Sequence, residues 1–374
     1  MKSVNTILFY ISGHGFGHVT RESPVIYALR RILPHYRIAV RSPAPIWFLQ
    51  ASLPPDTIIE RAEIDVGVRQ LDSLNMEREK TLHDYTNLIK NKSSIIASEA
   101  RWCIEHNVKL IVADIPPFAF DIARAVSVPS ICIANFAWDW IYAAFLPQYP
   151  AFAPVIDDIK SSHSLCALCL TTPLTCDLSS FPNRQSIPLI CRQSAMTKEE
   201  ARFKAGLPPN KKILLFSFGG FGLNSGFKKI PRIPLDTVIV STQPDLQMDG
   251  FIYLSRADIS KLKIEYWDLV RAADAVITKP GYGIVAECLA NQTPIIYTER
   301  EGFPEYDVIV KEMKQYLPAL HLPQTELLSG NWHQYLEEFY RLDKSFHPLP
   351  LNGAETAAGI IGGFLKIQSE VSRR

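Results

Sequence analysis

Two histidines and three glycines alternate in a short loop near the N-terminus, Ser12-Gly13-His14-Gly15-Phe16-Gly17-His18. The loop follows an apolar run that predicts a strand, Thr6–Ile11, and precedes a run with helical spacing, Glu22–Leu33. Glycines let the backbone turn tightly, and free N–H groups at a helix start attract anions. An imidazole placed here can accept a proton, so His14 and His18 are both candidate general bases. The alternative is a plain strand-to-helix turn in which a histidine serves as a cap.

A carboxylate, Asp114, ends another expected strand, Lys109–Asp114, just before Pro116. In open parallel sheets the ligand crevice lies beyond the carboxyl ends of the strands, so Asp114 and the first loop should face the same crevice. A carboxylate beside an imidazole fixes its tautomer and raises its basicity, which makes His18 with Asp114 a plausible general-base pair. Asp114 could instead only cap the following helix, Ala119–Val126.

Two glycine-rich turns in the second half of the chain also follow expected strands. Phe218-Gly219-Gly220-Phe221-Gly222 ends the strand Lys212–Phe218, and a turn of this kind could approach a diphosphate. Lys279-Pro280-Gly281-Tyr282-Gly283 follows the strand Ala275–Thr278 and starts a helix, Gly283–Ala290. The N-terminus of that helix is a natural phosphate site.

Three charged residues lie near this second turn. Glu287, about one turn into the helix, is placed for the vicinal hydroxyls of a ribose, although a solvated helix residue is the alternative. Arg300 and Glu301 follow the next expected strand, Pro294–Thr298, and could read sugar hydroxyls.

An aromatic and polar cluster, Asn135–Tyr142, follows the expected strand Pro129–Ala134. It could be core packing, or it could line the crevice where aromatic rings stack on sugars or apolar acceptors. Asn135, Trp138 and Asp139 are its candidate site residues.

These motifs need two α/β halves to position them. Strands, among them Arg37–Arg41 and Thr237–Ser241, alternate with helices on both sides of a proline-rich stretch, Asp177–Asn210. Within that stretch, Thr197 and Glu200 predict a capping box. Such alternation predicts right-handed crossovers and parallel sheets covered on both faces. We therefore expect two Rossmann-like, doubly wound domains, residues 1–185 and 186–374, facing a central cleft, with the last helix able to cross back to the first domain.

Composition excludes several classes. The chain has 374 residues, of which 47% are hydrophobic, and a formal net charge of +1, which gives no argument for nucleic-acid binding. Its seven cysteines, without an export signal, indicate reduced thiols and a cytoplasmic protein with no transmembrane segment. Cys166 and Cys169 form a lone CxxC inside an apolar run that looks like a buried strand, Ser164–Thr172, so we expect no metal site. The glycine spacing of the first loop does not match the dinucleotide fingerprint.

The chain resembles GT-B-fold glycosyltransferases, and more narrowly the bacterial predicted glycosyltransferases related to the N-terminal region of plant L-arabinokinases. The ordered stretches that carry this resemblance are Ser12–Arg21, Gln70–Ser73, Val112–Pro116, Asn135–Tyr142, Leu214–Gly220, Lys279–Glu287, Gly330-Asn331-Trp332 and Asn352-Gly353-Ala354-Glu355. The sugar-kinase domain of the plant proteins is not present in this sequence, so kinase activity is not expected.

The resemblance implies transfer of a sugar from a nucleoside diphosphate donor, expected to be UDP-linked, to a small-molecule or lipid-linked acceptor. It implies inversion, with His18 as base, Asp114 behind it and His14 as a rival, and it implies neither a metal nor a cofactor. The donor side would comprise Gly219, Gly220, Lys279, Gly281, Tyr282, Gly283, Glu287, Arg300 and Glu301, and the acceptor side Gly15, Gly17, Asn135, Trp138 and Asp139. A nucleotide-sugar 2-epimerase or hydrolase and a non-catalytic nucleotide-sugar sensor remain alternatives.

Overall fold

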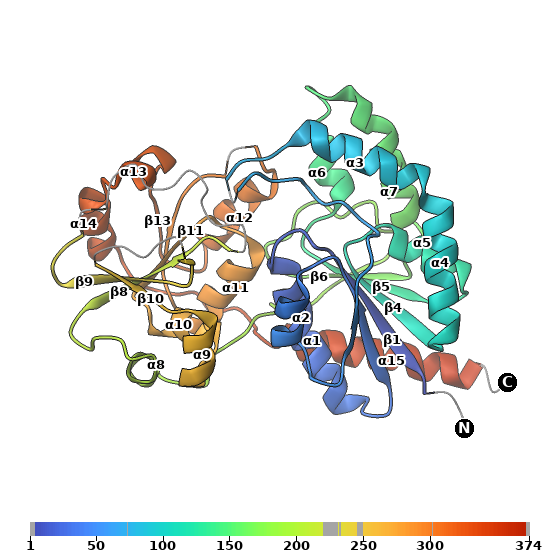
Figure 1. Cartoon of the computed structure of the whole chain (residues 1–374), viewed down its shortest axis with the longest axis horizontal. Coiled ribbons are helices and arrows are strands. Elements are labelled where there is room, and N and C mark those ends of the chain that lie inside the picture. Colours follow the sequence, from blue (N-terminus) through green and yellow to red (C-terminus); the bar gives the residue numbers. More distant parts are fainter. Residues whose placement is uncertain are drawn as a thin grey trace. The chain divides into compact units, whose positions relative to one another are not determined.

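The computed structural model describes residues 4–72, 74–219, 231, 233–244, 250–300 and 302–371. The chain divides into two compact units, each built around one sheet. The first unit comprises Met1–Arg69, Met76–Ile190 and Pro350–Arg374, and the second comprises Gln70–Asn75 and Cys191–Leu349 (Figure 1). The boundary expected after residue 185 therefore falls within the last strand of the first unit, Arg184–Ser186.

The first unit contains a parallel sheet in the order β3-β2-β1-β4-β5-β6-β7. Its strands are β1 (Thr6–Ile11), β2 (Arg37–Arg41), β3 (Ile58–Glu60), β4 (Val108–Asp114), β5 (Ser130–Ala134), β6 (Leu168–Thr171) and β7 (Arg184–Ser186). Every residue of β1 is buried, as expected for a parallel strand covered on both faces. Because the order reverses between β1 and β4, the carboxyl ends of these two strands form the switch point where ligands bind in such sheets.

Helices cover both faces of this sheet (Figure 1). One face carries α1 (Gly17–Ile32), α2 (Ile46–Ser52) and α15 (Gly353–Val371), and Ile26, Leu29, Ala357 and Ile361 from α1 and α15 share a core with β1, β2, β4 and β5. The remaining helices of the unit are α3 (Arg78–Lys90), α4 (Lys92–Glu105), α5 (Phe118–Ala125), α6 (Trp138–Ala143), η1 (Pro150–Phe152) and α7 (Ala153–His163). The C-terminal segment thus belongs to the first unit because α15 buries its apolar stripe against α1.

The second unit holds a parallel sheet in the order β10-β9-β8-β11-β12-β13. Its strands are β8 (Lys212–Ser217), β9 (Thr237–Ser241), β10 (Phe251–Tyr253), β11 (Ala275–Thr278), β12 (Ile295–Tyr297) and β13 (Ala319–His321). Its helices are α8 (Lys198–Lys204), α9 (Arg256–Leu262), α10 (Tyr266–Ala272), α11 (Tyr282–Asn291), α12 (Glu305–Met313), α13 (Gln324–Ser329) and α14 (His333–Arg341). Trp332, Leu336 and Phe339 pack in a core with β8, β11 and β12, and Leu74 joins the same core from the short segment 70–75.

The structure confirms the predicted α/β class with two doubly wound parallel sheets. The strands expected at Thr6–Ile11, Arg37–Arg41, Thr237–Ser241 and Ala275–Thr278 have those bounds, and the capping box of Thr197 and Glu200 is present. Two expectations need correction. Helix α1 begins at Gly17, five residues before the expected start at Glu22, and the strand expected over Ser164–Thr172 covers only Leu168–Thr171.

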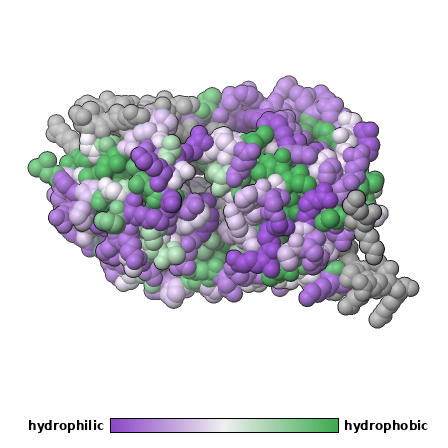
Figure 2. All heavy atoms as spheres, turned by 60° about the horizontal axis from the view of Figure 1, so that its bottom comes forward, coloured by the Kyte–Doolittle hydropathy of each residue, from purple (hydrophilic) through white to green (hydrophobic). Residues whose placement is uncertain are grey.

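Hydrophilic side chains predominate on the face of the molecule drawn in Figure 2, and apolar ones gather there in smaller separate areas. Among the exposed large apolar side chains are Tyr27 and Ile32 on α1 and Ile46 and Trp47 on α2. Within the part of the chain that the structure describes, no helix combines the length and apolar character needed to span a bilayer.

Candidate functional sites

His18 and Asp114 meet at the switch point of the first sheet. His18 lies in the first turn of α1, which follows β1, and Asp114 is the last residue of β4, the strand beside β1. Nδ1 of His18 lies 2.9 Å from Oδ1 of Asp114, and both side chains are almost completely buried. Since a carboxylate only accepts, the neutral ring of His18 has its proton on Nδ1 and its lone pair on Nε2. The predicted pairing of these two residues therefore exists in the fold.

Arg21 holds the same carboxylate from the other side. One turn after His18 on α1, its Nε donates to Oδ2 of Asp114 at 3.0 Å and its Nη2 to Oδ1. Nη1 of Arg21 donates to the side-chain oxygen of Asn135, directly after β5. Burial alone would raise the pKa of Asp114, but the charges of Arg21 and His18 lower it below the usual value. Asp114 is therefore ionised and fixed in orientation, and Asn135 acts on it through Arg21.

Glu22 is a second carboxyl group next to Asp114. Its side chain is fully buried, and neither of its oxygens has a hydrogen-bond partner among the described residues. Burial raises the pKa of Glu22 well above the usual value, the charge of Asp114 adds to this, and the charge of Arg21 opposes it. The structure thus places a carboxyl group with a raised pKa beside one with a lowered pKa.

His14 lies on the same loop but has the opposite tautomer. Its Nδ1 accepts the backbone N–H of Val68 at 3.2 Å. A backbone N–H is always a donor, so in the neutral ring Nδ1 has the lone pair and Nε2 has the proton. Gly67, with a φ of +66°, packs so closely on His14 that a Cβ there would lie 2.8 Å from the Cβ of His14. A hydrogen bond and close packing therefore hold His14 against the segment 65–68, which lacks regular secondary structure.

Asp65 on this segment is a further buried carboxylate near His18. The indole N–H of Trp138 donates to its Oδ2 at 3.2 Å, and Ser12 also donates to it. Burial raises the pKa of Asp65, while the bond from Ser12 and the charge of His18 partly offset that effect. Trp138 itself is fully buried, and its ring lies edge-on to His14 at a centroid distance of 5.2 Å. Trp138 thus packs as a buried ring against His14 and His18 and does not present an exposed aromatic surface.

The other residues predicted on the acceptor side are two glycines of the first loop and Asp139. Gly15 adopts a φ of +76°, which favours glycine, and so turns the loop into α1, whose first residue is Gly17. Asp139 points elsewhere, because its Oδ1 lies 3.3 Å from Nδ1 of the buried His163 on α7. The structure therefore brings Asn135 and Trp138 close to His18 and Asp114, and it leaves Asp139 in a separate contact with His163.

In the second unit, Lys279 and the start of α11 form a candidate anion site at the carboxyl end of β11. Gly281 is the N-cap of α11 with extended backbone, and Val285 is the first residue of the helix to donate back to it, at 3.1 Å. The N–H groups of Tyr282, Gly283 and Ile284 precede this first helical bond and define the positive end of the helix dipole. A Cβ added at Gly281 would meet no atom within 4 Å, so a ligand has room to approach the backbone.

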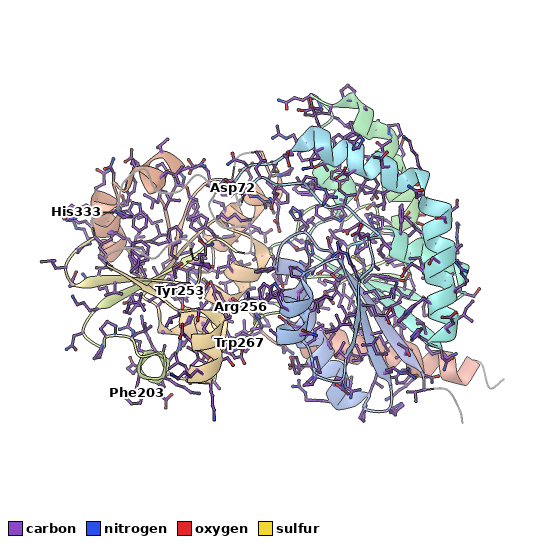
Figure 3. The ribbon with its side chains drawn as sticks, in the orientation of Figure 1. Asp72, Phe203, Tyr253, Arg256, Trp267 and His333 are labelled. Carbon is purple, nitrogen blue, oxygen red and sulfur yellow. The ribbon has the colours of Figure 1, made fainter. Side chains whose placement is uncertain are left out.

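Lys279 and Arg300 supply positive charge to this end of the second sheet. Desolvation lowers the pKa of Lys279 well below the usual value, and the charge of Arg300 adds to this, while Glu305 and Asp72 oppose it. Burial lowers the pKa of Arg300 to about 10. Asp72, labelled in Figure 3, comes from the segment 70–75 that belongs to this unit.

Glu287 has a partner that sequence reasoning did not anticipate. It is buried on α11, and its Oε1 accepts Nε of Arg192 at 2.6 Å and also Nη2. The guanidinium of Arg192 lies over the ring of Trp267, which is labelled in Figure 3, 4.7 Å from the centroid. Burial raises the pKa of Glu287, and the charge of Arg192 opposes that shift. One visible function of Glu287 is thus to fix the segment that enters the second unit, and its contact with a ribose stays a prediction.

The glycine turn after β8 is only partly described. Gly219 has a φ of +68°, its carbonyl accepts the side-chain amide of Gln243 at 3.3 Å, and a Cβ there would meet no atom within 4 Å. Gly220 and Glu301, both predicted on the donor side, lie outside the described residues. Within the described part of the chain, no group of three or more His, Cys, Asp or Glu side chains is arranged to hold a metal ion.

Sequence reasoning missed three residues of the first site, Arg21, Glu22 and Asp65. Arg21 could have been found, because it lies three residues after His18 and so shares its helix face once α1 is known to start at Gly17. Asp65 gives no local signal, because only tertiary folding brings the segment 65–68 to the first loop.

Known proteins resemble this chain in sequence and in fold. No family model matches the chain. L-arabinokinase of Arabidopsis thaliana is 26% identical over 358 residues, a match that covers 94% of this chain and 34% of that protein, in its N-terminal region. The chain thus spans about a third of the length of this relative.

Two solved structures have the same fold over nearly the whole chain. The spinosyn rhamnosyltransferase SpnG superposes with a TM-score of 0.59 at 11% identity, covering 96% of each chain. The glycosyltransferase VinC, in complex with dTDP, gives a TM-score of 0.57 at 12% identity, covering 96% of this chain and 95% of VinC. The chain therefore has the GT-B fold of glycosyltransferases, and its predicted resemblance to that class and to the plant L-arabinokinases is confirmed.

Proposed function

We propose that this protein is a glycosyltransferase that moves a sugar from a nucleoside diphosphate to an acceptor hydroxyl or amine. The observation that carries the proposal is the buried pair of His18 and Asp114, with 2.9 Å between Nδ1 and Oδ1, at the switch point of a GT-B fold. A histidine whose Nε2 keeps its lone pair is the group that such a reaction needs in order to deprotonate the acceptor.

The donor is proposed to bind the second unit. Its diphosphate would accept the N–H groups at the start of α11, between Gly281 and Ile284, and would pair with Lys279. Support for a pyrimidine nucleotide comes from VinC, which was solved with dTDP, and we propose a UDP-linked or dTDP-linked sugar. The N–H groups stabilise the diphosphate as it leaves, because its negative charge grows at the positive end of the helix.

The proposed reaction is a single displacement. Nε2 of His18 takes the proton from the acceptor, and the acceptor atom forms a bond to the anomeric carbon of the donor. The bond from that carbon to the diphosphate oxygen breaks in the same step, so the configuration inverts. Asp114 stabilises the imidazolium through Nδ1, and Arg21 keeps Asp114 ionised and oriented. His14 is less suited as base, since its Nδ1 lone pair already accepts Val68.

The test combines binding with turnover. Thermal-shift and calorimetric titrations with UDP, dTDP, ADP and GDP should show preference for a pyrimidine diphosphate. With a panel of hydroxyl and amine acceptors, His18→Ala should keep nucleotide affinity and lose transfer by about 10²-fold to 10⁴-fold. His14→Ala, the matched control from the same loop, should lose much less.

Three outcomes would contradict the proposal. Transfer by His18→Ala at the wild-type rate would remove the base assignment. Consumption of the donor without any acceptor would indicate a hydrolase or an epimerase. Failure of every nucleotide to bind the wild-type protein would remove the donor site.

A further inference from the structure

Arg300 is a buried cation, and two of its N–H donors have no hydrogen-bond partner among the described residues. It follows β12 by three residues, and its side chain is 5% exposed. Within the described part of the chain, its Nε and Nη2 have no hydrogen-bond partner. These two N–H groups lie on one edge of the guanidinium and point in parallel, which is the edge that binds two oxygens of one carboxylate. A charged group that has lost water and gained no acceptor needs a ligand to offset its desolvation.

The neighbouring Phe303 ring orients the guanidinium plane of Arg300 but accepts no hydrogen bond from Nε or Nη2. The guanidinium carbon of Arg300 lies 3.6 Å from the centroid of the Phe303 ring. Glu305, the first residue of α12, supplies a nearby negative charge. Among the described residues, however, no carboxylate lies within ion-pair distance of Arg300. Lys279 is close enough for the two positive charges to repel, and Asp72 and Glu305 partly offset the charge of Lys279.

We propose that Arg300 binds the carboxylate of a uronic acid, so that the donor is a nucleoside diphosphate hexuronate. This inference rests on the proposed function, in which the diphosphate is held by the start of α11 and by Lys279. Arg300 lies after β12, the next strand of the sheet, and therefore reaches a different part of the same donor. A neutral sugar hydroxyl would occupy one N–H and leave the charge uncompensated, whereas a carboxylate occupies both and neutralises it.

The experiment compares donors that differ only at C6. Calorimetry on the full-length protein would use UDP, the pair UDP-glucose and UDP-glucuronate, and the pair UDP-galactose and UDP-galacturonate. We expect the wild-type protein to bind one uronate at least about tenfold more tightly than its neutral partner. Arg300→Gln should abolish this difference and leave the affinity for UDP unchanged, and Arg300→Lys should keep part of it. Arg256→Gln, at an exposed arginine on α9 labelled in Figure 3, controls for the loss of one positive charge.

Each other result overturns the inference in a recognisable way. Equal binding of uronates and neutral sugars by the wild-type protein would exclude a carboxylate site while leaving the proposed function intact. Loss of UDP affinity in folded Arg300→Gln and Arg300→Lys would assign Arg300 to the diphosphate. No binding of any nucleotide would remove the proposed function together with this inference. Thermal unfolding of both variants separates a folding defect from a binding defect.

Discussion

At the scale of single residues, the two buried glutamates of the candidate sites differ in what surrounds them. Glu22 has no hydrogen-bond partner in the described structure, whereas Glu287 is held by Arg192. Burial raises the pKa of both, and a cation opposes the shift in both, Arg21 for Glu22 and Arg192 for Glu287, but only Arg192 is hydrogen-bonded to its glutamate. Replacement by glutamine is therefore expected to change stability in opposite directions at the two positions.

Replacing Glu22 by Gln should change how stability depends on pH. The folded protein keeps Glu22 protonated above about pH 4.3, where an unfolded glutamate has released its proton. The folded state then binds more protons, so stability falls as pH rises through this window up to the raised pKa. Glu22→Gln removes this loss, and urea unfolding between about pH 5 and about pH 8 should show a flatter decline than in the wild-type protein.

Glu287→Gln is the matched comparison. It leaves the guanidinium of Arg192 without its carboxylate, so the free energy of unfolding should fall at neutral pH, by about 3 kcal/mol at most because Arg192 is partly exposed. An unchanged pH dependence in Glu22→Gln would show that Glu22 is not the protonated group.

At the scale of elements, the decisive features are where helices begin and what they pack against. Helix α1 starts early enough to place His18, Arg21 and Glu22 in its first two turns. The C-terminal helix α15 lies on α1 through Ala357, Ala358 and Ile361. Its first residue, Gly353, donates its N–H to the carbonyl of Leu189 at 3.1 Å, which fixes the return of the chain to the first unit.

Gly353→Ala should therefore destabilise the first unit. A Cβ there would overlap the carbonyl oxygen of Pro188 and lie 2.7 Å from backbone atoms of Leu189, so the start of α15 must shift. We expect a loss of about 1–3 kcal/mol, as in other overpacked sites, measured by urea unfolding. Gly359→Ala, in the same helix with no atom within 4 Å, should instead gain up to about 1 kcal/mol. Equal effects of the two changes would show that helix propensity alone governs this helix.

At the scale of the whole molecule, each unit has its own sheet and core, yet the chain passes between them more than once. Residues 70–75 belong to the second unit in the middle of the first, and the segment from Pro350 returns to the first. In the proposed function, this arrangement gives the base to one unit and the donor site to the other.

Hydrogen exchange should report this division. A nucleoside diphosphate alone should slow exchange most at Tyr282, Gly283 and Ile284, whose N–H groups precede the first bond of α11. Mass spectrometry of peptides with and without nucleotide measures the effect. Stronger slowing in the loop Ser12–Gly17 than in α11 would place the nucleotide on the first unit and contradict the proposed donor site.

The sequence by itself determined the periodic part of this protein. Apolar runs and glycine turns gave the α/β class, four strands with their bounds, and the pairing of His18 with Asp114, because these signals are local and strand ends of a parallel sheet converge. The tertiary structure determined the contacts between residues that lie far apart in the sequence. Only folding showed that Asp65 reaches the first loop, that Arg192 holds Glu287, and that α15 returns to α1. It also distinguished the roles of the two histidines. The tautomer of each neutral ring depends on a partner far away in the chain, Val68 for His14 and Asp114 for His18.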